Sequence, residues 1–459
     1  MKIKKIHFIG IGGIGMSSLA FFLSKKYHLS GSDVGSGPII NKLRKSGVNI
    51  NIGHSAKNIN NQDLVIYSSA INKSNIELVE AKKRKITSIS RGEALAEFTK
   101  NKKNICVTGT HGKSTSTSFI SQILINCGRD INAFLGAMDR KLKTNFIHGK
   151  SNINVIEADE SDNSFNYLKP EISLITNIDY DHMDFYGSKE KLFKAFQSFI
   201  NKTTKCVIIN LDCKNIQKNL KTLNSKKITT FGYKNKKCDY YFTNNLPGTF
   251  ELYHENKKIG EILTSIEGLY NHYNLIGAII VCLKLGISFK KINKSINKIL
   301  TPKRRFENIF KSKYFEIYDD YAHHPNAISS LREMLNKSKD LSKNYLIFQP
   351  HRYTRFKESY SDFVKEISQW ENVIVTDVYS AHENKELKIS SKEFVKQVLN
   401  KKKINIQYMN EFDKIIDKMY GIFKKNKNKT KLITVGAGDI NQIGYRLKNK
   451  IKENKNYAR

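Results

Sequence analysis

A single stretch, residues 105–116, constrains what this chain can fold into more than any other part of its sequence. The apolar run 105–107 predicts a buried strand, and Gly109 and Gly112 then let the backbone curl so that its N–H groups point inward. Lys113 places an ammonium group inside the curl, and the helix predicted to follow adds the positive end of its dipole. A strand, such a turn and a helix in succession predict a loop that binds phosphate groups. A surface turn rich in Gly, Ser and Thr is the alternative.

The hydroxyl-bearing residues after this lysine add a metal ion to the prediction. Ser114 or Thr115 stands where a hydroxyl would bind a Mg²⁺ ion that bridges the outer phosphates of a nucleotide. The spacing differs from the usual Walker A motif, which has glycine five residues before Gly112, where this chain has Val107. The loop residues expected to contact the phosphates are Gly109, Thr110, His111, Gly112, Lys113, Ser114 and Thr115.

Acidic residues and one histidine follow two further apolar runs. The first run leads into four carboxylates within six positions, beginning at Glu157, and the run 172–176 leads into a second polar segment, 177–184. Clustered like charges repel one another, so these strand ends predict a nearby cation. We expect Glu157 and His182 to lie close to a metal, whereas Asp162 and Asp184 are better explained as solvated loop charges. Together with the phosphate loop, the two segments predict a parallel sheet that binds Mg-nucleotide at its carboxyl edge.

A second glycine turn lies near the start of the chain. Residues 6–9 predict a strand, Gly10–Gly15 fits G-x-G-x-x-G, and Asp33 stands where an acidic side chain usually meets a ribose. Such turns bind a nicotinamide cofactor, bind another diphosphate, or only allow a helix to pack closely, and the motif alone leaves all three open. The candidate ligand-binding residues here are Gly12, Gly13, Gly15 and Asp33 and, after the predicted strand 64–67, Ser68 and Ser69.

Strand and helix signals alternate again in the last third of the chain. Polar residues follow the predicted strand ends, as expected for an α/β sheet that lines a crevice. Arg352 and Arg355 lie on one side of a turn and would clamp a carboxylate or a phosphate. A pair of surface arginines is the alternative, but the neighbouring His351 and the pair His323-His324 favour the clamp.

The length of the chain, one polar segment and one proline divide it into three predicted regions. Its 459 residues are about three times a typical single domain. The polar segment 101–104 predicts a linker, and Pro302 ends a predicted helix. We therefore expect an α/β protein with domains at residues 1–99, 100–301 and 302–459.

The formal charge of +36, from 78 basic and 42 acidic residues, first suggests nucleic-acid binding. The excess is almost all lysine spread along the chain, so compositional drift explains it better and no nucleic-acid partner is expected. Six cysteines without a C-x-x-C spacing predict a reducing compartment. The first 24 residues imitate a signal peptide but lack a cleavage site, and residues 275–287 are too short to span a membrane. We expect a cytoplasmic protein with no membrane partner.

Seven motifs, in this order and spacing, resemble the ATP-dependent Mur ligase family, in its alanine-adding branch. They are GIGGIGMS, GTHGKST, EADESDNSF, TNIDYDHMD, DDYAHHP, QPHRYTRF and GAGDI, and they touch all three regions. The resemblance implies an N-terminal Rossmann-like domain that binds a UDP-sugar, a central P-loop ATPase-type domain with a mostly parallel sheet, and a C-terminal Rossmann-like domain that closes over the site. It implies a monomer or homodimer that joins L-alanine to the lactyl carboxylate of UDP-N-acetylmuramate through an acyl phosphate.

The same resemblance assigns roles residue by residue. Lys113 would contact ATP phosphates, Ser114 and Glu157 would bind one Mg²⁺, and His182 a second. Gly10–Gly15 would then hold the UDP diphosphate instead of a nicotinamide cofactor. The remaining nucleotide-binding positions are Asn271, Arg305 and Asp320. The positions around the amino acid and the transferred phosphate are Tyr321, His323, His351, Arg352 and Arg355, and the catalytic residues are Lys113, His182 and Arg355.

Three positions depart from the family pattern. Tyr270 replaces the first histidine of G-x-H-N-x-x-N, which affects the adenine contact. Phe196 follows Ala195 where some sister ligases carry a carbamylated lysine, and His382 stands where a small residue is common. The competing classes are a nicotinamide-dependent oxidoreductase, which leaves the phosphate loop without a role, a nucleic-acid-binding protein, and the family's murein tripeptide recycling ligase.

Overall fold

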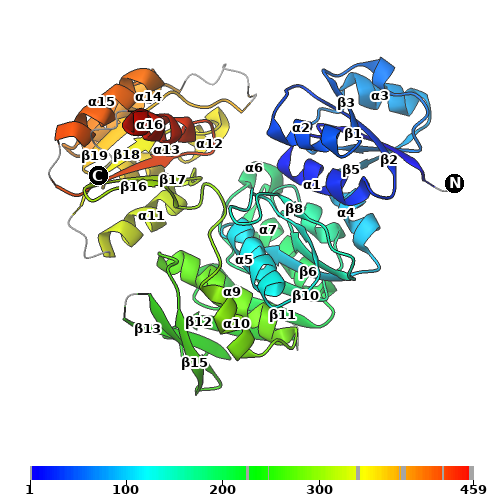
Figure 1. Cartoon of the computed structure of the whole chain (residues 1–459), viewed down its shortest axis with the longest axis horizontal. Coiled ribbons are helices and arrows are strands. Elements are labelled where there is room, and N and C mark those ends of the chain that lie inside the picture. Colours follow the sequence, from blue (N-terminus) through cyan, green and yellow to red (C-terminus); the bar gives the residue numbers. More distant parts are fainter. Residues whose placement is uncertain are drawn as a thin grey trace. The chain divides into compact units, whose positions relative to one another are not determined.

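The computed structural model describes residues 3–223, 227–246, 248–337, 342–381, 383, 389–425 and 428–453. His382, singled out from the sequence, lies outside these residues. The chain divides into two compact units, Met1–Pro302 and Lys303–Arg459. Three sheets with flanking helices make up the fold, so the α/β class predicted from the sequence is confirmed (Figure 1). Within the described residues, no helix is long and apolar enough to cross a membrane.

The N-terminal sheet is parallel throughout, with strand order β3-β2-β1-β4-β5. Its strands are β1 (Lys5–Ile9), β2 (His28–Asp33), β3 (Asn49–Ile52), β4 (Leu64–Tyr67) and β5 (Thr87–Ser90). Its helices are α1 (Ile14–Leu23), α2 (Pro38–Lys45), α3 (Ile76–Lys83) and α4 (Arg91–Thr99). The order reverses between β1 and β4, and a reversal of this kind opens a crevice at the carboxyl edge of the sheet. The first glycine turn and the loop after β4 flank that crevice.

The central sheet has the order β15-β14-β13-β12-β11-β10-β6-β9-β7-β8 and is parallel from β7 to β13. Its strands are β6 (Lys103–Thr108), β7 (Asn132–Phe134), β8 (Phe146–Ile147), β9 (Ile153–Glu157), β10 (Ile172–Ile175), β11 (Cys206–Asn210), β12 (Ile228–Tyr233), β13 (Tyr240–Leu246), β14 (Thr249–His254) and β15 (Lys257–Leu263). Helices α5 (Lys113–Asn126), α6 (Met183–Tyr186), α7 (Lys189–Lys202), α8 (Lys214–Asn219), α9 (Leu269–Lys284) and α10 (Phe289–Ile296) accompany it. Because β6 lies between β9 and β10, the phosphate loop and both acidic segments leave the sheet at neighbouring positions.

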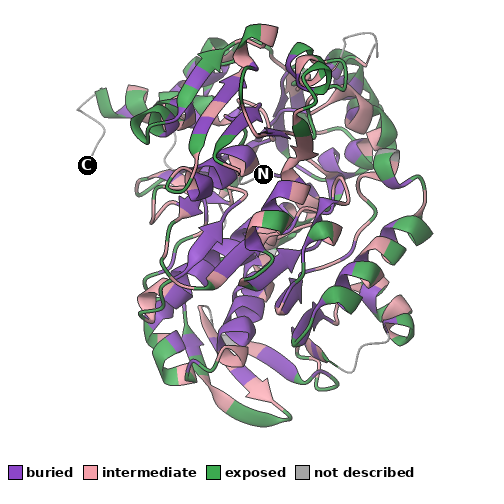
Figure 2. Ribbon diagram, turned by 90° about the vertical axis from the view of Figure 1, so that its right-hand side faces the viewer, coloured by how far each residue is buried: buried purple, intermediate pink, exposed green. Residues whose placement is uncertain are grey.

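The C-terminal sheet has the order β16-β17-β21-β18-β19-β20, parallel except for the edge strand β16. Its strands are β16 (Glu307–Lys311), β17 (Phe315–Asp320), β18 (Lys343–Phe348), β19 (Asn372–Val375), β20 (Asn405–Tyr408) and β21 (Thr430–Val435). Its helices are α11 (Pro325–Lys337), α12 (Tyr353–Glu358), α13 (Tyr360–Ile367), α14 (Ser391–Lys401), α15 (Phe412–Lys425) and α16 (Asn441–Glu453). The inner strands β17, β19 and β21 are buried along their whole length. Figure 2 colours the chain by burial, with buried strand residues in purple.

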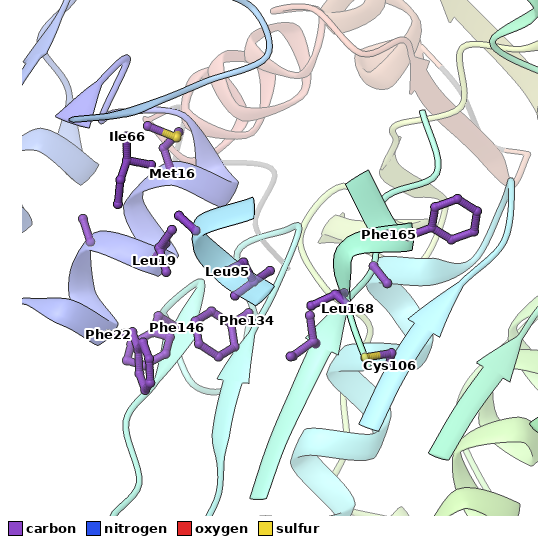
Figure 3. Packing of buried hydrophobic residues seen from close by; sticks show 14 of the residues in the cluster. Met16, Leu19, Phe22, Ile66, Leu95, Cys106, Phe134, Phe146, Phe165 and Leu168 are labelled. Carbon is purple, nitrogen blue, oxygen red and sulfur yellow. The ribbon is translucent and has the colours of Figure 1, made fainter. Parts of the chain in front are cut away.

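One hydrophobic cluster joins the N-terminal sheet region to the central sheet. Phe22 of α1 packs edge to face against Phe134 of β7, with ring centroids 5.1 Å apart, and lies 5.9 Å from Phe146 of β8. Leu95 of α4 belongs to the same buried cluster (Figure 3). These two sheets therefore share a core, although the linker near residue 100 separates them in the sequence.

A buried carboxylate holds the N-terminal sheet region together from within. Glu77, at the start of α3, is fully buried and accepts hydrogen bonds from Ser32 Oγ (2.5 Å) and Asn58 Nδ2 (2.5 Å), with His54 Nδ1 3.1 Å away. Burial works to raise the pKa of Glu77, but His7, Ser32 and Asn58 outweigh burial and lower it to about 2. The ionised carboxylate thus stabilises the fold.

We expect Glu77→Gln to lower the free energy of unfolding by about 3 kcal/mol at pH 7. A pKa lowered from 4.5 to about 2 in the folded protein corresponds to a stabilisation of about that size. The contribution is complete above pH 4.5 and disappears as the pH falls toward 2, so the melting temperatures of the wild type and the variant should converge in acid. Thermal melting at pH 7, 5 and 3 measures this. Glu80→Gln on the same helix, which removes the carboxylate paired with Arg84, is the control and should change little. A constant difference at every pH would contradict the assignment.

Candidate active site

The phosphate loop has the conformation that its glycines predict. Gly109 has φ 131° and Gly112 has φ 86°, values that side-chain-bearing residues rarely adopt. There is also no room for a side chain, because a Cβ on Gly109 would collide with Thr176 Oγ1 and one on Gly112 with Asn274 Oδ1. The loop is therefore enclosed by the segment after β10 and by the first turns of α9. Helix α5 begins directly after it, with its free N–H groups toward the loop.

Lys113 lies inside this curl. Its Nζ donates to the carbonyl oxygen of Gly109 (2.9 Å) and to Glu160 Oε1 (2.9 Å). Burial works to lower the pKa of Lys113, but Glu160 and Asp159 outweigh burial and raise it, so the ammonium stays charged. Sequence reasoning placed Glu160 only within an acidic cluster and missed its pairing with Lys113. The proximity of both residues to strand ends was the available signal.

Ser114 and Glu157 come together at the end of β9. Ser114 Oγ donates to Glu157 Oε1 (2.9 Å), and the Gly136 N–H donates to Glu157 Oε2 (2.8 Å). Burial raises the pKa of Glu157, opposed by Lys113 and Ser114. A hydroxyl and a carboxylate are hard oxygen donors, which fit Mg²⁺. Among the described residues no three His, Cys, Asp or Glu side chains form a metal cage, and Mg²⁺ bound mainly by phosphates and water needs none.

The segment after β10 contacts the loop through Asn177 and Asp179. The His111 N–H donates to Asn177 Oδ1 (2.9 Å), and the Asp179 N–H donates to Thr110 Oγ1 (2.8 Å). His182, with φ 57°, precedes α6, and its ring lies 3.6 Å from the carboxylate of Asp181. The sequence analysis placed Asn177 and Asp179 within the polar segment 177–184, as oxygen-bearing residues near a predicted cation, and did not predict their contacts with the loop. Their contacts show that they shape the loop.

Two asparagines at the start of α9 lie next to the loop. Asn274 Oδ1 accepts a hydrogen bond from Ser116 Oγ (3.1 Å), which ties α9 to α5. Asn271 is buried, and its Nδ2 donates to the carbonyl oxygen of Glu267 (2.9 Å), while its Oδ1 has no hydrogen-bond partner among the residues that the structure describes. A buried acceptor of this kind is suited to an amino group of a nucleotide base. Tyr270, the departure from the family pattern, occupies the same first turn of α9.

The first glycine turn is organised by the end of β2. The N–H groups of Gly10 and Ile11 donate to the carbonyl oxygen of Ser32, at 2.9 and 3.0 Å. Asp33 Oδ2 accepts the Gly12 N–H (2.8 Å), so the carboxylate braces the turn itself. Gly13 then caps α1, whose N-terminus faces the crevice edge of the sheet. Ser68 and Ser69 follow β4, and a Cβ on Gly10 would lie 3.4 Å from Ser68 Cβ.

In the C-terminal unit, the predicted amino-acid-binding residues gather around one histidine. The His351 ring is 5.9 Å from that of His323 and stacks on Tyr379 at 5.5 Å, with a 9° angle between planes. Arg355 Nη1 is 3.4 Å from His351 Nδ1. Burial, followed by Arg355 and Arg352, lowers the pKa of His351 to about 4, so its ring is neutral at pH 7.

Glu383 positions the second arginine. Its Oε1 accepts hydrogen bonds from Arg352 Nε (2.6 Å) and Thr354 Oγ1 (2.6 Å). Sequence reasoning missed the roles of Glu383 and Tyr379. Glu383 contacts Arg352, and Tyr379 stacks on His351, across about thirty residues of chain, so only the folded structure shows these contacts. The available signal was that Glu383 lies in a polar segment after a predicted strand.

The predicted nucleotide contacts of this unit lie at the end of β17. Asp320 is buried and accepts the N–H groups of Phe306 (2.7 Å) and Ala322 (2.8 Å). Burial raises the pKa of Asp320, and Arg305 opposes that shift. Arg305 lies over the ring of Tyr321, 5.3 Å from its centroid. Arg304, which the sequence did not single out, donates to the Gly436 and Gly438 carbonyls and so holds the loop after β21.

Comparison with known sequence families gives three adjacent matches along the chain. The "Mur ligase family, catalytic domain" matches residues 5–103, the "Mur ligase middle domain" residues 107–282, and the "Mur ligase, glutamate ligase domain" residues 304–438. Each match covers one of the three sheets.

Curated relatives and solved structures agree with these matches. A UDP-N-acetylmuramate–L-alanine ligase of Aquifex aeolicus is 38% identical over 86% of this chain and 88% of its own length. The same enzyme of Fusobacterium nucleatum is 36% identical over 97% of both. The crystal structure of the Thermotoga maritima UDP-N-acetylmuramate–alanine ligase superimposes with a TM-score of 0.80 at 26% identity, covering 98% of this chain and 99% of its own. A murein peptide ligase of Psychrobacter arcticus shares the fold, with a TM-score of 0.71 at 20% identity over 97% and 98% of the two chains.

Proposed function

This chain belongs to the Mur ligase family, and on that premise we propose how its described residues divide the work of one ligation reaction. The reaction is the ATP-dependent joining of L-alanine to UDP-N-acetylmuramate, with formation of ADP, in peptidoglycan precursor synthesis. The observation that carries this conclusion is the match over nearly the whole chain to relatives with that activity.

We assign one substrate to each region of the chain. Residues 1–99 bind the UDP-sugar at the glycine turn, with Asp33, Ser68 and Ser69 beside it. Residues 100–301 bind ATP at the phosphate loop. Residues 302–459 supply the amino-acid site around His351 and close over the reaction. What supports the first two assignments is that each glycine turn lies at the carboxyl edge of a parallel sheet, beside a helix N-terminus.

The chemistry requires that a carboxylate first be activated. The lactyl carboxylate attacks the γ-phosphorus of ATP, ADP leaves, and the resulting acyl phosphate reacts with the amine of alanine to release phosphate. Negative charge collects on the phosphoryl oxygens, and Lys113, held inside the loop, stabilises that charge. Domain closure would exclude water, which otherwise hydrolyses the acyl phosphate.

We propose that Ser114 and Glu157 hold one Mg²⁺ and that His182 contributes to a second. The adjacent hydroxyl and carboxylate oxygens at 2.9 Å support the first assignment. When bound, the metal neutralises phosphate charge and orients the γ-phosphoryl group. Asn271, with its buried acceptor, would receive the adenine amino group, while Arg305 and Asp320 complete the nucleotide contacts.

On the amino-acid side, Arg355 and Arg352 would bind the carboxylate of alanine and the transferred phosphate, with Tyr321 and His323 beside them. The neutral His351 ring supports this arrangement, because it adds no further positive charge next to two guanidinium groups. We place the enzyme in the cytoplasm, since two of its substrates, ATP and UDP-N-acetylmuramate, are nucleotides and the cysteines of the described residues are free thiols.

Phosphate release tests the function directly. We expect release only when ATP, Mg²⁺, UDP-N-acetylmuramate and L-alanine are all present, with loss of the signal on omission of any one. Replacing alanine by the tripeptide L-alanyl-γ-D-glutamyl-meso-diaminopimelate separates this enzyme from a murein peptide ligase. Turnover with the tripeptide and none with alanine would contradict the proposal.

A further inference from the structure

Arg91 lies where two substrate regions meet, and sequence reasoning assigned it no role. It is the first residue of α4 and directly follows β5. The carboxyl end of β5 faces the same edge as those of β1 and β4, where the glycine turn and Ser68 lie. A capping box formed by Ser90 and Glu93 fixes this helix start. The backbone that carries Arg91 is therefore well defined.

The Arg91 side chain packs against the glycine turn. A Cβ on Gly15 would lie 3.2 Å from Arg91 Cδ, 3.2 Å from Nη1 and 3.3 Å from Nε. Gly15 is in the first turn of α1, so the guanidinium lies directly beside the N-terminus of that helix. The absence of a side chain at position 15 is what allows this approach.

On its other side, Arg91 faces the ATP-binding region. Its Nη2 is 3.9 Å from Asp159 Oδ2, a residue of the acidic segment after β9. A Cβ on Gly92 would lie 2.5 Å from Ser164 Cβ, so the start of α4 is pressed against the segment that follows Asp159. Packing from both sides thus holds Arg91 in place.

The electrostatics of this position call for an anion. The side chain is only 17% exposed, and within the described part of the chain its guanidinium makes the Asp159 ion pair and no hydrogen bond. A guanidinium has five N–H donors, and a largely buried one is normally paired. Arg91 also stands at the N-terminus of its own helix and beside that of α1, where positive charge is unfavourable. A ligand with negatively charged oxygens would accept hydrogen bonds from the unused N–H donors and would offset the positive charge beside the two helix N-termini.

We propose that Arg91 binds the diphosphate of the UDP-sugar, completing the site that the glycine turn begins. The inference rests on the proposed function, since it names a residue for the same substrate. The diphosphate is favoured over the lactyl carboxylate because the guanidinium touches Gly15, at the helix N-terminus where phosphate oxygens bind. Through Asp159, the same side chain connects the sugar site to the ATP-binding region.

Two ligands that differ only at the lactyl group test this. UDP-N-acetylglucosamine carries the diphosphate but lacks the lactyl carboxylate, so its inhibition constant reports the diphosphate contact. We expect Arg91→Met to raise both the KM for UDP-N-acetylmuramate and that inhibition constant by about tenfold to a hundredfold, the range for a lost charge-assisted hydrogen bond. Arg91→Lys should have a smaller effect. The KM values for ATP and alanine should stay within about twofold. Arg84→Met, which removes an exposed arginine of the same sheet region, is the matched control.

Each contrary outcome has a distinct meaning. Unchanged constants in Arg91→Met, or a lower melting temperature with unchanged constants, would overturn the proposal. A raised KM for UDP-N-acetylmuramate with an unchanged inhibition constant would assign Arg91 to the carboxylate and overturn the diphosphate contact. If the wild type failed to turn over UDP-N-acetylmuramate, the proposed function would fail instead, and calorimetric binding of UDP-N-acetylglucosamine would still test Arg91.

Discussion

Lys113→Ala should abolish ligation, with a fall in kcat of at least about a thousandfold and only a modest change in melting temperature. The ammonium lies inside the phosphate loop, where it would stabilise the charge that develops as the γ-phosphoryl group is transferred. Its removal leaves Glu160 without its ion-pair partner. Because burial raises the pKa of Glu160 to about 7, that carboxyl group takes up a proton at little cost once the lysine is gone. Steady-state phosphate release measures the loss.

A control on β6, the strand that leads into the loop, separates the role of Lys113 from a general effect of removing a positive charge. Lys103 begins β6, is exposed, and lies at the opposite end of the strand from the loop, so Lys103→Ala should retain wild-type turnover. A double variant, Lys113→Ala with Glu160→Gln, should be as inactive as Lys113→Ala alone. Its melting temperature should be no lower than that of Lys113→Ala. Near-normal turnover in Lys113→Ala would remove the phosphate loop from the mechanism.

Arg355→Ala has the second-largest expected effect: a KM for alanine raised by about a hundredfold, or no measurable turnover. The guanidinium lies beside a neutral imidazole, 3.4 Å from His351 Nδ1, so the neighbouring ring cannot replace its charge. Charge-assisted contacts with a carboxylate or phosphate are among the stronger polar interactions. Initial rates over a range of alanine concentrations at saturating ATP measure the change.

Two variants sharpen this test. Lys357→Ala removes an exposed cation from the same helix, α12, and should leave the KM for alanine unchanged. Arg355→Lys keeps the charge but loses the planar fork, so we expect an intermediate KM. Kinetics in Arg355→Ala that match those of the wild type would cancel its assigned role.

The sequence predicted best what depends on short stretches of chain. The phosphate loop, the glycine turn at Gly10–Gly15 and the polar strand ends each combine a strand, a turn and a helix start within about a dozen residues. Parallel sheets then bring such strand ends to one edge, which is why the α/β class followed from the same pattern. Glycines at 109 and 112 were informative because the backbone there cannot accept a side chain.

The contacts that escaped sequence reasoning join residues that lie far apart in the chain. Arg91 meets Gly15 and Asp159, and Glu383 meets Arg352, only because several strands and helices are packed first. Asp33 shows a related difficulty: the motif places an acidic side chain near a ribose, yet here that side chain also braces the Gly12 N–H, which the motif does not encode. Contacts between residues so far apart in the sequence arise only when the strands and helices pack together, so no short motif predicts them.

The cluster of Phe22, Phe134 and Phe146 has a consequence for how such an enzyme can be divided or recombined. The line near residue 100 separates two sheets but not two interiors, so excising the first ninety-nine residues would strip apolar cover from β7 and β8. The first two sheets therefore have to be kept together in any truncated or recombined variant, whereas the boundary between the two compact units falls at Pro302.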